Sequence, residues 1–151
     1  MLYLDDLPPG RRIDLPGTFT VTEEEIIAFA RQFDPQPFHT DPEAAKRTAF
    51  RGLAASGWHT AGLTMAHLVK HLFISENGIP GLGAELQWPR PTRPGDVLHL
   101  RVEVLESRAS RSNGSQGVAR LRMTTFNAAD EPVQVFTGTV VVPVRPDGAG
   151  R

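Results

Sequence analysis

Residues 57–73 form the stretch that most constrains the fold of this chain. Small or apolar residues occupy almost every helical face of this stretch, and a helix that is apolar all round belongs inside a core. Three histidines and a lysine interrupt it, so it does not suit a membrane span, which needs about 20 mostly apolar residues. The rest of the chain must therefore supply an apolar surface that covers this helix on most sides.

The second half of the chain predicts that surface. Residues 98–104 and 118–126 alternate apolar with polar side chains, which is the pattern of a half-buried strand. Asn113-Gly114 lies between these two segments and is a hairpin signal. Residues 82–88 and 133–144 predict two more strands. Consecutive strands joined by hairpins favour an α+β domain in which the long helix lies on an antiparallel sheet that curls around it.

The sequence of the first third of the chain predicts a short strand and two helices. Residues 12–21 indicate a short, interrupted strand. Thr22 and Glu25 have the spacing of a capping box, which begins a helix that Pro35 then ends. The dipeptide Asp41-Pro42 predicts the start of another short helix.

The composition excludes several classes of protein. The chain has 151 residues, of which 40% are hydrophobic, so we expect one domain over residues 1–144 and a loose polar tail over residues 145–151. A net charge of −1 argues against a general nucleic-acid or membrane binder. The absence of cysteine excludes disulfides and thiolate chemistry. The first ten residues hold two aspartates and no signal-peptide core, so we expect a cytoplasmic protein.

An acid and an imidazole lie five residues apart in the proline-stiffened segment Asp34-Pro35-Gln36-Pro37-Phe38-His39. Further along, Ser56 is a good helix N-cap, and Gly57 would be the first helical residue. Unpaired N–H groups at that position can receive an oxyanion. An acid–base pair that faces a helix N-terminus suits the activation of a carbonyl compound. The alternative is that Asp34 caps a turn and His39 is an ordinary polar loop residue.

The segment 34–39 resembles the hydratase motif of the MaoC-like dehydratases, the (R)-specific enoyl-CoA hydratase family of hot-dog-fold proteins. The motif reads aspartate, any residue, asparagine, proline, any residue, histidine, and this chain departs from it at Gln36. Gly57 falls where the family has its oxyanion glycine. Further matching residues are Asp41, Pro91 and the pair Gly95-Asp96. The resemblance covers roughly residues 7–144 and implies a hot-dog fold, in which a curved antiparallel sheet wraps a long central helix.

The resemblance also implies an activity. Members of the family are hydro-lyases that add water reversibly to a trans-2-enoyl thioester and give a 3-hydroxyacyl thioester. Here Asp34 and His39 would hold the water and share the acid–base work. The N–H of Gly57 would stabilise the thioester oxygen as an enolate develops. Neither a metal ion nor a redox cofactor is required, and coenzyme A or an acyl carrier protein would carry the substrate.

Four residues beside these groups are candidates for substrate binding: Gln36, Ser56, Trp58 and His59. Gln36 either orients the site or stabilises the loop, and Ser56 is chiefly a helix cap. Where the family commonly has histidine-glycine-methionine, this chain has Ser56-Gly57-Trp58, which would put an indole near the acyl pocket. Arg108 and Arg111 are either ligands for carrier phosphates or solvated charges on a hairpin.

Two other functions fit the same fold. A hot-dog thioesterase would use a carboxylate to activate water against the carbonyl carbon, and the aspartate–histidine motif speaks against it. A non-catalytic acyl-thioester-binding module would keep the fold, and the fold alone does not exclude it because one fold hosts many functions.

The sequence also bears on metal sites and on assembly. His67 and His71 are four residues apart on the predicted helix, but no third ligand accompanies them, so we expect no metal site.

Strands that are joined by hairpins leave a sheet edge that needs cover or a partner. We therefore expect a homodimer or a higher homo-oligomer, with an acyl thioester as the small-molecule partner.

Overall fold

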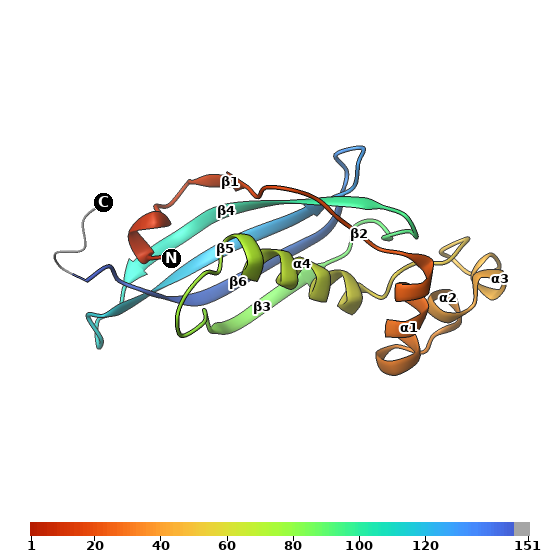
Figure 1. Ribbon diagram of the computed structural model, residues 1–151, viewed down its shortest axis with the longest axis horizontal. Coiled ribbons are helices and arrows are strands. Elements are labelled where there is room, and N and C mark those ends of the chain that lie inside the picture. Colours follow the sequence, from red (N-terminus) through yellow and green to blue (C-terminus); the bar gives the residue numbers. More distant parts are fainter. Residues whose placement is uncertain (147–151) are drawn as a thin grey trace.

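An antiparallel sheet forms the body of the molecule in the computed structural model, which describes residues 1–146 (Figure 1). Its six strands are β1 (Arg12–Asp14), β2 (Phe19–Thr20), β3 (Gly81–Gln87), β4 (Val97–Ala109), β5 (Gln116–Phe126) and β6 (Pro132–Pro143). The order is β1-β4-β5-β6-β3, and β2 also pairs with β4. The chain therefore places β3, the first long strand in the sequence, at an edge of the sheet beside the last strand.

The helices lie on one face and at one end of this sheet. They are the 3-10 turn η1 (Leu4–Asp6) and the α-helices α1 (Glu23–Phe33), α2 (Pro37–Thr40), α3 (Pro42–Ala45) and α4 (Gly57–His71). Figure 1 shows α4 lying along the sheet, whereas α1, α2 and α3 gather beyond the end of α4 that carries its first residue. In the part of the chain that the structure describes, no helix is both long and apolar enough to cross a membrane.

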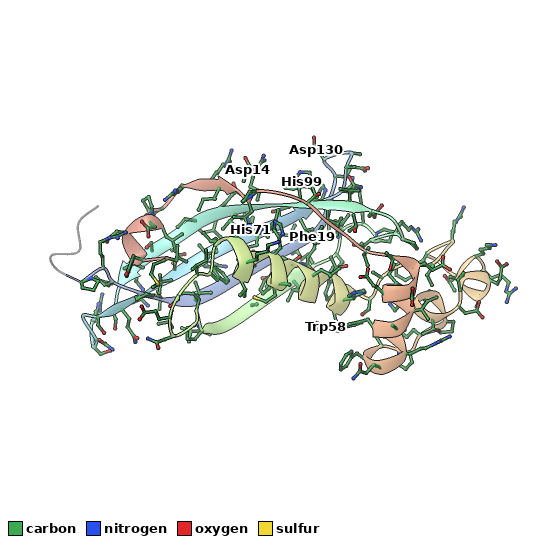
Figure 2. All side chains as sticks on the ribbon, in the orientation of Figure 1. Asp14, Phe19, Trp58, His71, His99 and Asp130 are labelled. Carbon is green, nitrogen blue, oxygen red and sulfur yellow. The ribbon has the colours of Figure 1, made fainter. Side chains whose placement is uncertain are left out.

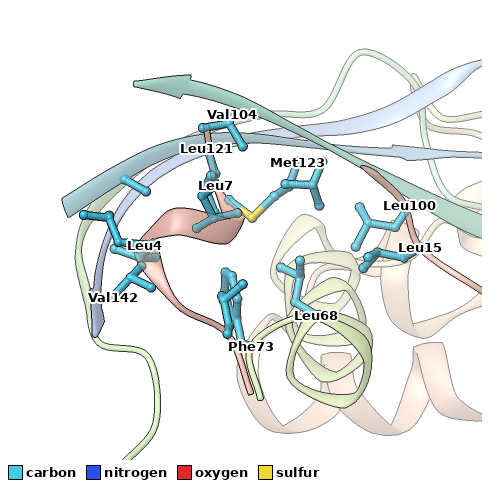
Figure 3. Packing of buried hydrophobic residues seen from close by; sticks show 14 residues of the cluster. Leu4, Leu7, Leu15, Leu68, Phe73, Leu100, Val104, Leu121, Met123 and Val142 are labelled. Carbon is cyan, nitrogen blue, oxygen red and sulfur yellow. The ribbon is translucent and has the colours of Figure 1, made fainter. Parts of the chain in front are cut away.

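The main core lies between α4 and the sheet. Figure 3 shows Leu68 of α4 and the following Phe73 facing side chains of η1, β4, β5 and β6. Along β4, Leu98, Leu100 and Val102 are buried and alternate with residues that face solvent, as the sequence predicted. The cluster of buried side chains includes Leu4, Leu7, Leu15, Leu68, Phe73, Leu100, Val102, Val104, Leu121, Met123 and Val142.

The prediction that the long helix is buried on most sides is wrong for the single chain. Thr64 and Leu68 face the sheet and are completely buried. On the opposite face, Trp58, Met65 and Val69 are 60%, 37% and 53% exposed. The sheet covers only one face of α4, and the helical period of 3.6 residues places these three side chains together on the other. α4 also ends at His71, two residues before the predicted end, because Leu72 leaves the helical conformation.

Local signals set the ends of the shorter helices as predicted. The side chain of Thr22 accepts from the N–H of Glu25, and the carboxylate of Glu25 accepts from the N–H of Thr22, which is a complete capping box. Asp41 caps α3 through the N–H groups of residues 43 and 44. The proline-stiffened segment before it, which the sequence predicted as a loop, instead contains the one-turn helix α2 with Pro37 at its first position.

The last described residues contact the first residues of the chain. Arg145, which the sequence places in a loose tail, lies 4.4 Å from the ring centre of Tyr3 and 3.1 Å from the carboxylate of Asp6. The domain therefore keeps contacts past residue 144. The remainder of the expected tail, residues 147–151, lies outside the described residues.

The contact between η1 and β5 leads to a stability prediction. A Cβ atom on Gly117 would lie 2.5 Å from the Leu4 side chain and 2.6 Å from the backbone oxygen of Arg108. We expect Gly117→Ala to lower the free energy of unfolding by about 1–3 kcal/mol, because this backbone oxygen cannot move aside without disturbing the β4–β5 ladder. Urea unfolding followed by circular dichroism measures the change.

Gly114→Ala is the matched control for this measurement. Gly114 lies in the hairpin between β4 and β5, and a Cβ atom there would have no neighbour within 4 Å. If both variants unfold at the same urea concentration as the parent protein, the close packing of η1 on β5 is wrong.

Candidate active site

A turn of helix brings the acid and the imidazole together. Asp34 follows the last residue of α1, and its N–H donates to the carbonyl of Ala30. His39 lies on α2, whose single turn folds it back toward Asp34. Asp34 Oδ2 and His39 Nε2 are 3.4 Å apart, and the His39 side chain is only 6% exposed. The five-residue spacing in the sequence therefore becomes a direct acid–imidazole pair.

A hydrogen bond to the backbone fixes the orientation of the His39 ring. Nδ1 lies 2.6 Å from the carbonyl oxygen of Ala54. Because a carbonyl oxygen only accepts, Nδ1 carries the proton, and in the neutral ring Nε2 is left as an acceptor that faces Asp34. Two acceptors at this separation are suited to receive the two O–H groups of one water molecule.

Asp34 accepts two further hydrogen bonds from polar side chains. Gln36 Nε2 donates to Oδ1 at 2.6 Å, and Ser56 Oγ donates to Oδ2 at 2.7 Å. Burial raises the pKa of Asp34, but the hydrogen bonds from Gln36 and Ser56, with a smaller contribution from the charge that His39 carries when it is protonated, outweigh burial and hold the pKa below the ordinary value of 3.8. Asp34 is therefore ionised at neutral pH, as a proton acceptor must be.

Ser56 connects this pair to the N-terminus of α4. Its hydroxyl oxygen also accepts from the N–H of Trp58 at 3.3 Å, which makes it the N-cap. Gly57 is the first residue of the helix. Within residues 1–146 its N–H donates to no protein acceptor, so it is available to an oxyanion.

The indole of Trp88 explains why residue 57 has no side chain. A Cβ atom on Gly57 would lie 2.7 Å from ring atoms Cδ2 and Cζ2 of Trp88. Trp88 Nε1 donates to Gln134 Oε1 at 2.9 Å, and the completely buried Gln134 donates to Thr64 at 3.0 Å. A larger residue at position 57 would therefore displace the indole as well as crowd the oxyanion site, a packing role that the sequence did not predict.

These groups border a pocket of about 780 Å³. Four parts of the chain line it. They are α2 with its N-cap, the loop that follows α3, the start of α4 with the residues just before it, and the connection between β3 and β4. Its lining residues are Gln36, Phe38, His39, Ala49, Phe50, Arg51, Ala55, Gly57, Thr60, Trp88, Pro89, Arg90, Pro91, Thr92 and Arg93. The imidazole, the free helix N–H and a largely apolar wall thus share one cavity.

The family described as MaoC like domain matches residues 6–126. This chain belongs to the MaoC-like family. A crystal structure of a MaoC-like dehydratase from Rhodospirillum rubrum is 47% identical, with a TM-score of 0.91 over 97% of this chain and 99% of the other. The fold of this MaoC-like protein is therefore the predicted α+β hot-dog fold.

Two curated relatives are similar over nearly the whole of this MaoC-like protein. The uncharacterized protein YdeM of Bacillus subtilis is 30% identical over 95% of this chain and 99% of its own length. A 3-hydroxybutyryl-CoA dehydratase of Methylorubrum extorquens is 32% identical over 95% of this chain and 85% of its own length. The family predicted from the hydratase motif is confirmed.

The candidate residues fall into two groups in the MaoC-like fold. Gln36, His39 and Gly57 line the pocket, and Asp34 and Ser56 join them through the contacts described above. The second group lies outside the pocket lining. It comprises Trp58, His59 and the two arginines of the β4–β5 hairpin.

Trp58 and His59 lie on α4 but outside the lining of the pocket. Trp58 is exposed near the end of α4 that faces α1 (Figure 2). Its ring packs edge-on against Trp88, with ring centres 5.5 Å apart. His59 is buried and stacks on Phe29 of α1 at 4.6 Å. Burial lowers the pKa of His59, although the charge of Glu25 opposes this shift. Trp58 thus packs against a residue of the pocket wall, whereas His59 packs α4 against α1.

Arg108 lies near the end of β4 and Arg111 in the hairpin that follows, at the end of the sheet away from α1–α3 (Figure 1). They do not line the pocket of their own chain. The arginines that do line it come from the loop after α3 and from the β3–β4 connection, where no local pattern in the sequence singled them out. The one sequence feature that pointed to the β3–β4 connection was the pair Gly95-Asp96. The carboxylate of Asp96 accepts from the N–H of Arg93 and so stabilises the fold of this connection.

No group of three or more histidine, aspartate and glutamate side chains is placed to hold a metal ion among residues 1–146. His67 and His71 are neighbours, with ring centres 4.4 Å apart, and His67 also packs on Phe19. Burial and the neighbouring His71 lower the pKa of His67, although a hydrogen bond to Pro16 opposes this.

The Ser56–Asp34 contact leads to a prediction about the carboxylate. We expect Ser56→Ala to raise the pKa of Asp34, because the variant lacks one of the two side-chain hydrogen bonds that favour the ionised form. Carbon-13 NMR titration of the aspartate carboxyls measures this shift. A lowered folded-state pKa stabilises the fold above the pKa of unfolded aspartate, and this stabilisation is lost as the pH falls through the folded-state value. The stability difference between parent and variant should therefore shrink at acid pH.

Thr22→Ala is the matched control because it also removes a helix N-cap, at α1 instead of α4. Each variant should lose about 1 kcal/mol of stability from its cap. An equal pKa of Asp34 in Ser56→Ala and in the parent protein would show that the serine is only a cap.

Proposed function

We propose that this MaoC-like protein catalyses the reversible addition of water to a trans-2-enoyl thioester, giving a 3-hydroxyacyl thioester. The observation that carries the proposal is the pair Asp34 and His39, with Oδ2 and Nε2 3.4 Å apart, beside a pocket that also holds the free N–H of Gly57. Similarity to a protein named 3-hydroxybutyryl-CoA dehydratase supports this reaction class.

The pair suits the proton transfers of this reaction. A water molecule that donates to Asp34 Oδ2 and His39 Nε2 has its oxygen lone pair directed away from both and toward the pocket. As this oxygen bonds to C3 of the enoyl group, one water proton passes to the pair. The same pair returns one proton to C2, so the product gains the whole of one water and the site recovers its starting protonation.

The start of α4 suits the charge that develops during this step. Attack at C3 moves electrons through C2 to the thioester oxygen, which becomes enolate-like. The N–H of Gly57 and the positive end of the α4 dipole stabilise this oxygen. Trp88, Pro89 and Pro91 line this side of the pocket, and a substrate that fills the pocket would displace water from it, which would strengthen the interaction. This reaction needs no resident metal ion or redox cofactor.

Replacing either member of the pair tests the reaction. We expect Asp34→Asn and His39→Gln each to lower kcat by about 100- to 10,000-fold, because each removes an acid–base group while keeping approximate side-chain size. The double variant should lose far less than the product of the two single losses, because both residues act on one water. Loss of the conjugated-thioester absorbance of crotonyl-CoA measures turnover, and a separate thiol assay reports hydrolysis.

Asp41→Asn is the matched control. Asp41 caps α3 outside the pocket, and asparagine is an equally good cap, so this variant should keep both its stability and its activity. Folded single variants with activity within a few-fold of the parent would contradict the hydratase proposal. Thiol release without loss of an enoyl group would favour a thioesterase, and tight binding without turnover would favour a binding module.

We also propose that the active protein is a homodimer or a higher homo-oligomer. Trp58, Met65 and Val69 form an exposed apolar stripe on α4, and Leu82 on the edge strand β3 is 64% exposed. Apolar side chains beside an unpaired sheet edge are suited to a second copy of the chain. A two-fold axis is the commonest way to close such an interface.

Light scattering at micromolar concentration tests the assembly. We expect a dimer or larger species, and we expect Val69→Glu to shift it toward monomer because a charge would be buried in the interface. Val97→Glu, at an exposed valine on β4 outside the stripe, is the control and should leave the assembly unchanged. A monomeric parent protein would contradict the proposal.

A further inference from the structure

The pocket carries an excess of positive charge. Arg51, Arg90 and Arg93 line it, and none of the other lining residues is an aspartate or a glutamate. The whole chain has a net charge of −1, so this concentration of arginine is local. A cavity with one sign of charge attracts ligands of the opposite sign.

Two of these arginines are occupied by contacts within the protein. The guanidinium of Arg93 donates to the backbone carbonyls of Phe50, Gly52 and Leu53. Arg90 pairs with Glu131, with Nε and Oε2 2.8 Å apart. Arg93 therefore stabilises the loop after α3, and Arg90 pairs with the turn before β6, so neither guanidinium is free for a ligand.

Arg51 differs from both. Its side chain is exposed and lines the pocket, and within residues 1–146 it has no hydrogen-bond or ion-pair partner. It is the pocket cation that remains available to a ligand.

The fold holds Arg51 in an unusual backbone conformation. Its φ angle is +54°, in the left-handed region where glycine and asparagine are the favoured residues. Arg93 binds the carbonyls on both sides of it, those of Phe50 and Gly52, and so keeps the loop in this shape. A strained non-glycine residue that persists at a pocket is typical of a ligand site. The turn itself does not require arginine, so the side chain needs another explanation.

We propose that Arg51 binds a phosphate group of the carrier to which the acyl thioester is attached. This inference rests on the proposed function, which places the thioester at Asp34, His39 and Gly57. A pantetheine arm then extends from the sulfur to a phosphate, both in coenzyme A and in the prosthetic group of a carrier protein. A guanidinium pairs with phosphate oxygens through two parallel N–H donors, and it stays charged at any physiological pH.

Three thioesters that differ only in the carrier test this assignment: crotonyl-CoA, crotonyl-phosphopantetheine and crotonyl-pantetheine. For Arg51→Gln we expect KM for crotonyl-CoA to rise about 10-fold, as for one lost charge-assisted contact. KM for crotonyl-pantetheine, which has no phosphate, should stay unchanged, and so should kcat for all three. Arg51→Lys should restore part of the loss because it keeps the charge but not the paired donors.

Arg47→Gln is the matched control. Arg47 is also exposed and lies four residues earlier, outside the pocket, so its replacement should change none of the KM values. Arg51→Gly gives a second control on folding: it relieves the backbone strain, so its melting temperature should not fall, while its KM for crotonyl-CoA should rise as in Arg51→Gln.

The pattern of KM changes identifies the phosphate. A rise for both phosphorylated thioesters assigns Arg51 to the phosphate that coenzyme A shares with carrier proteins. A rise for crotonyl-CoA alone assigns it to the phosphates of the nucleotide part. Unchanged KM values, or an equal rise for crotonyl-pantetheine, would overturn the proposal.

Calorimetric titration with coenzyme A and with phosphopantetheine separates this inference from the proposed function. If the parent protein turns over none of the thioesters, the hydratase proposal fails. Weaker binding of coenzyme A by Arg51→Gln than by Arg47→Gln would still support the phosphate contact, and equal binding would overturn it.

Discussion

The packing of α4 on the sheet is the interaction on which the rest of the structure depends. Apolar burial of Leu68 against the strands supplies the driving force, but it does not by itself set the position of the helix along the sheet. Buried hydrogen bonds do so: Thr64 bonds to Thr125 at 2.9 Å and accepts from Gln134. Because an unpaired polar group in the core costs free energy, these contacts favour one position of α4 and thus place Gly57 beside Trp88.

The site uses this placement to join two parts of the chain that carry different chemical groups. The segment after α1 supplies the carboxylate and the imidazole, and α4 supplies an N-terminus with a free N–H. Ser56 links the two, since one hydroxyl caps the helix and donates to Asp34. The same contact favours the ionised carboxylate, so helix capping and proton chemistry are coupled in this protein.

Two features of the single chain lack partners within residues 1–146: the exposed apolar stripe of α4 and the side chain of Arg51. Both are costly in isolation, one through exposed apolar surface and the other through a strained backbone that a second arginine maintains. They lie at different places, the stripe beside the sheet edge and Arg51 beside the pocket. The first suits a second protein copy and the second a small anion.

The sequence by itself determined the features that depend on near neighbours in the chain. The alternation in β4 and β5, the capping box at Thr22 and the Asp41 cap are local, because each follows from residues a few positions apart. The motif at residues 34–39 is also local, and it was enough to predict the family. Contacts between distant residues were decided only by the tertiary structure. Ser56 donates to a carboxylate 22 residues away, and Arg93 holds a loop about 40 residues before it. No local pattern encodes such pairs, because they form only when the packing of α4 on the sheet brings the separate segments to one end of the molecule.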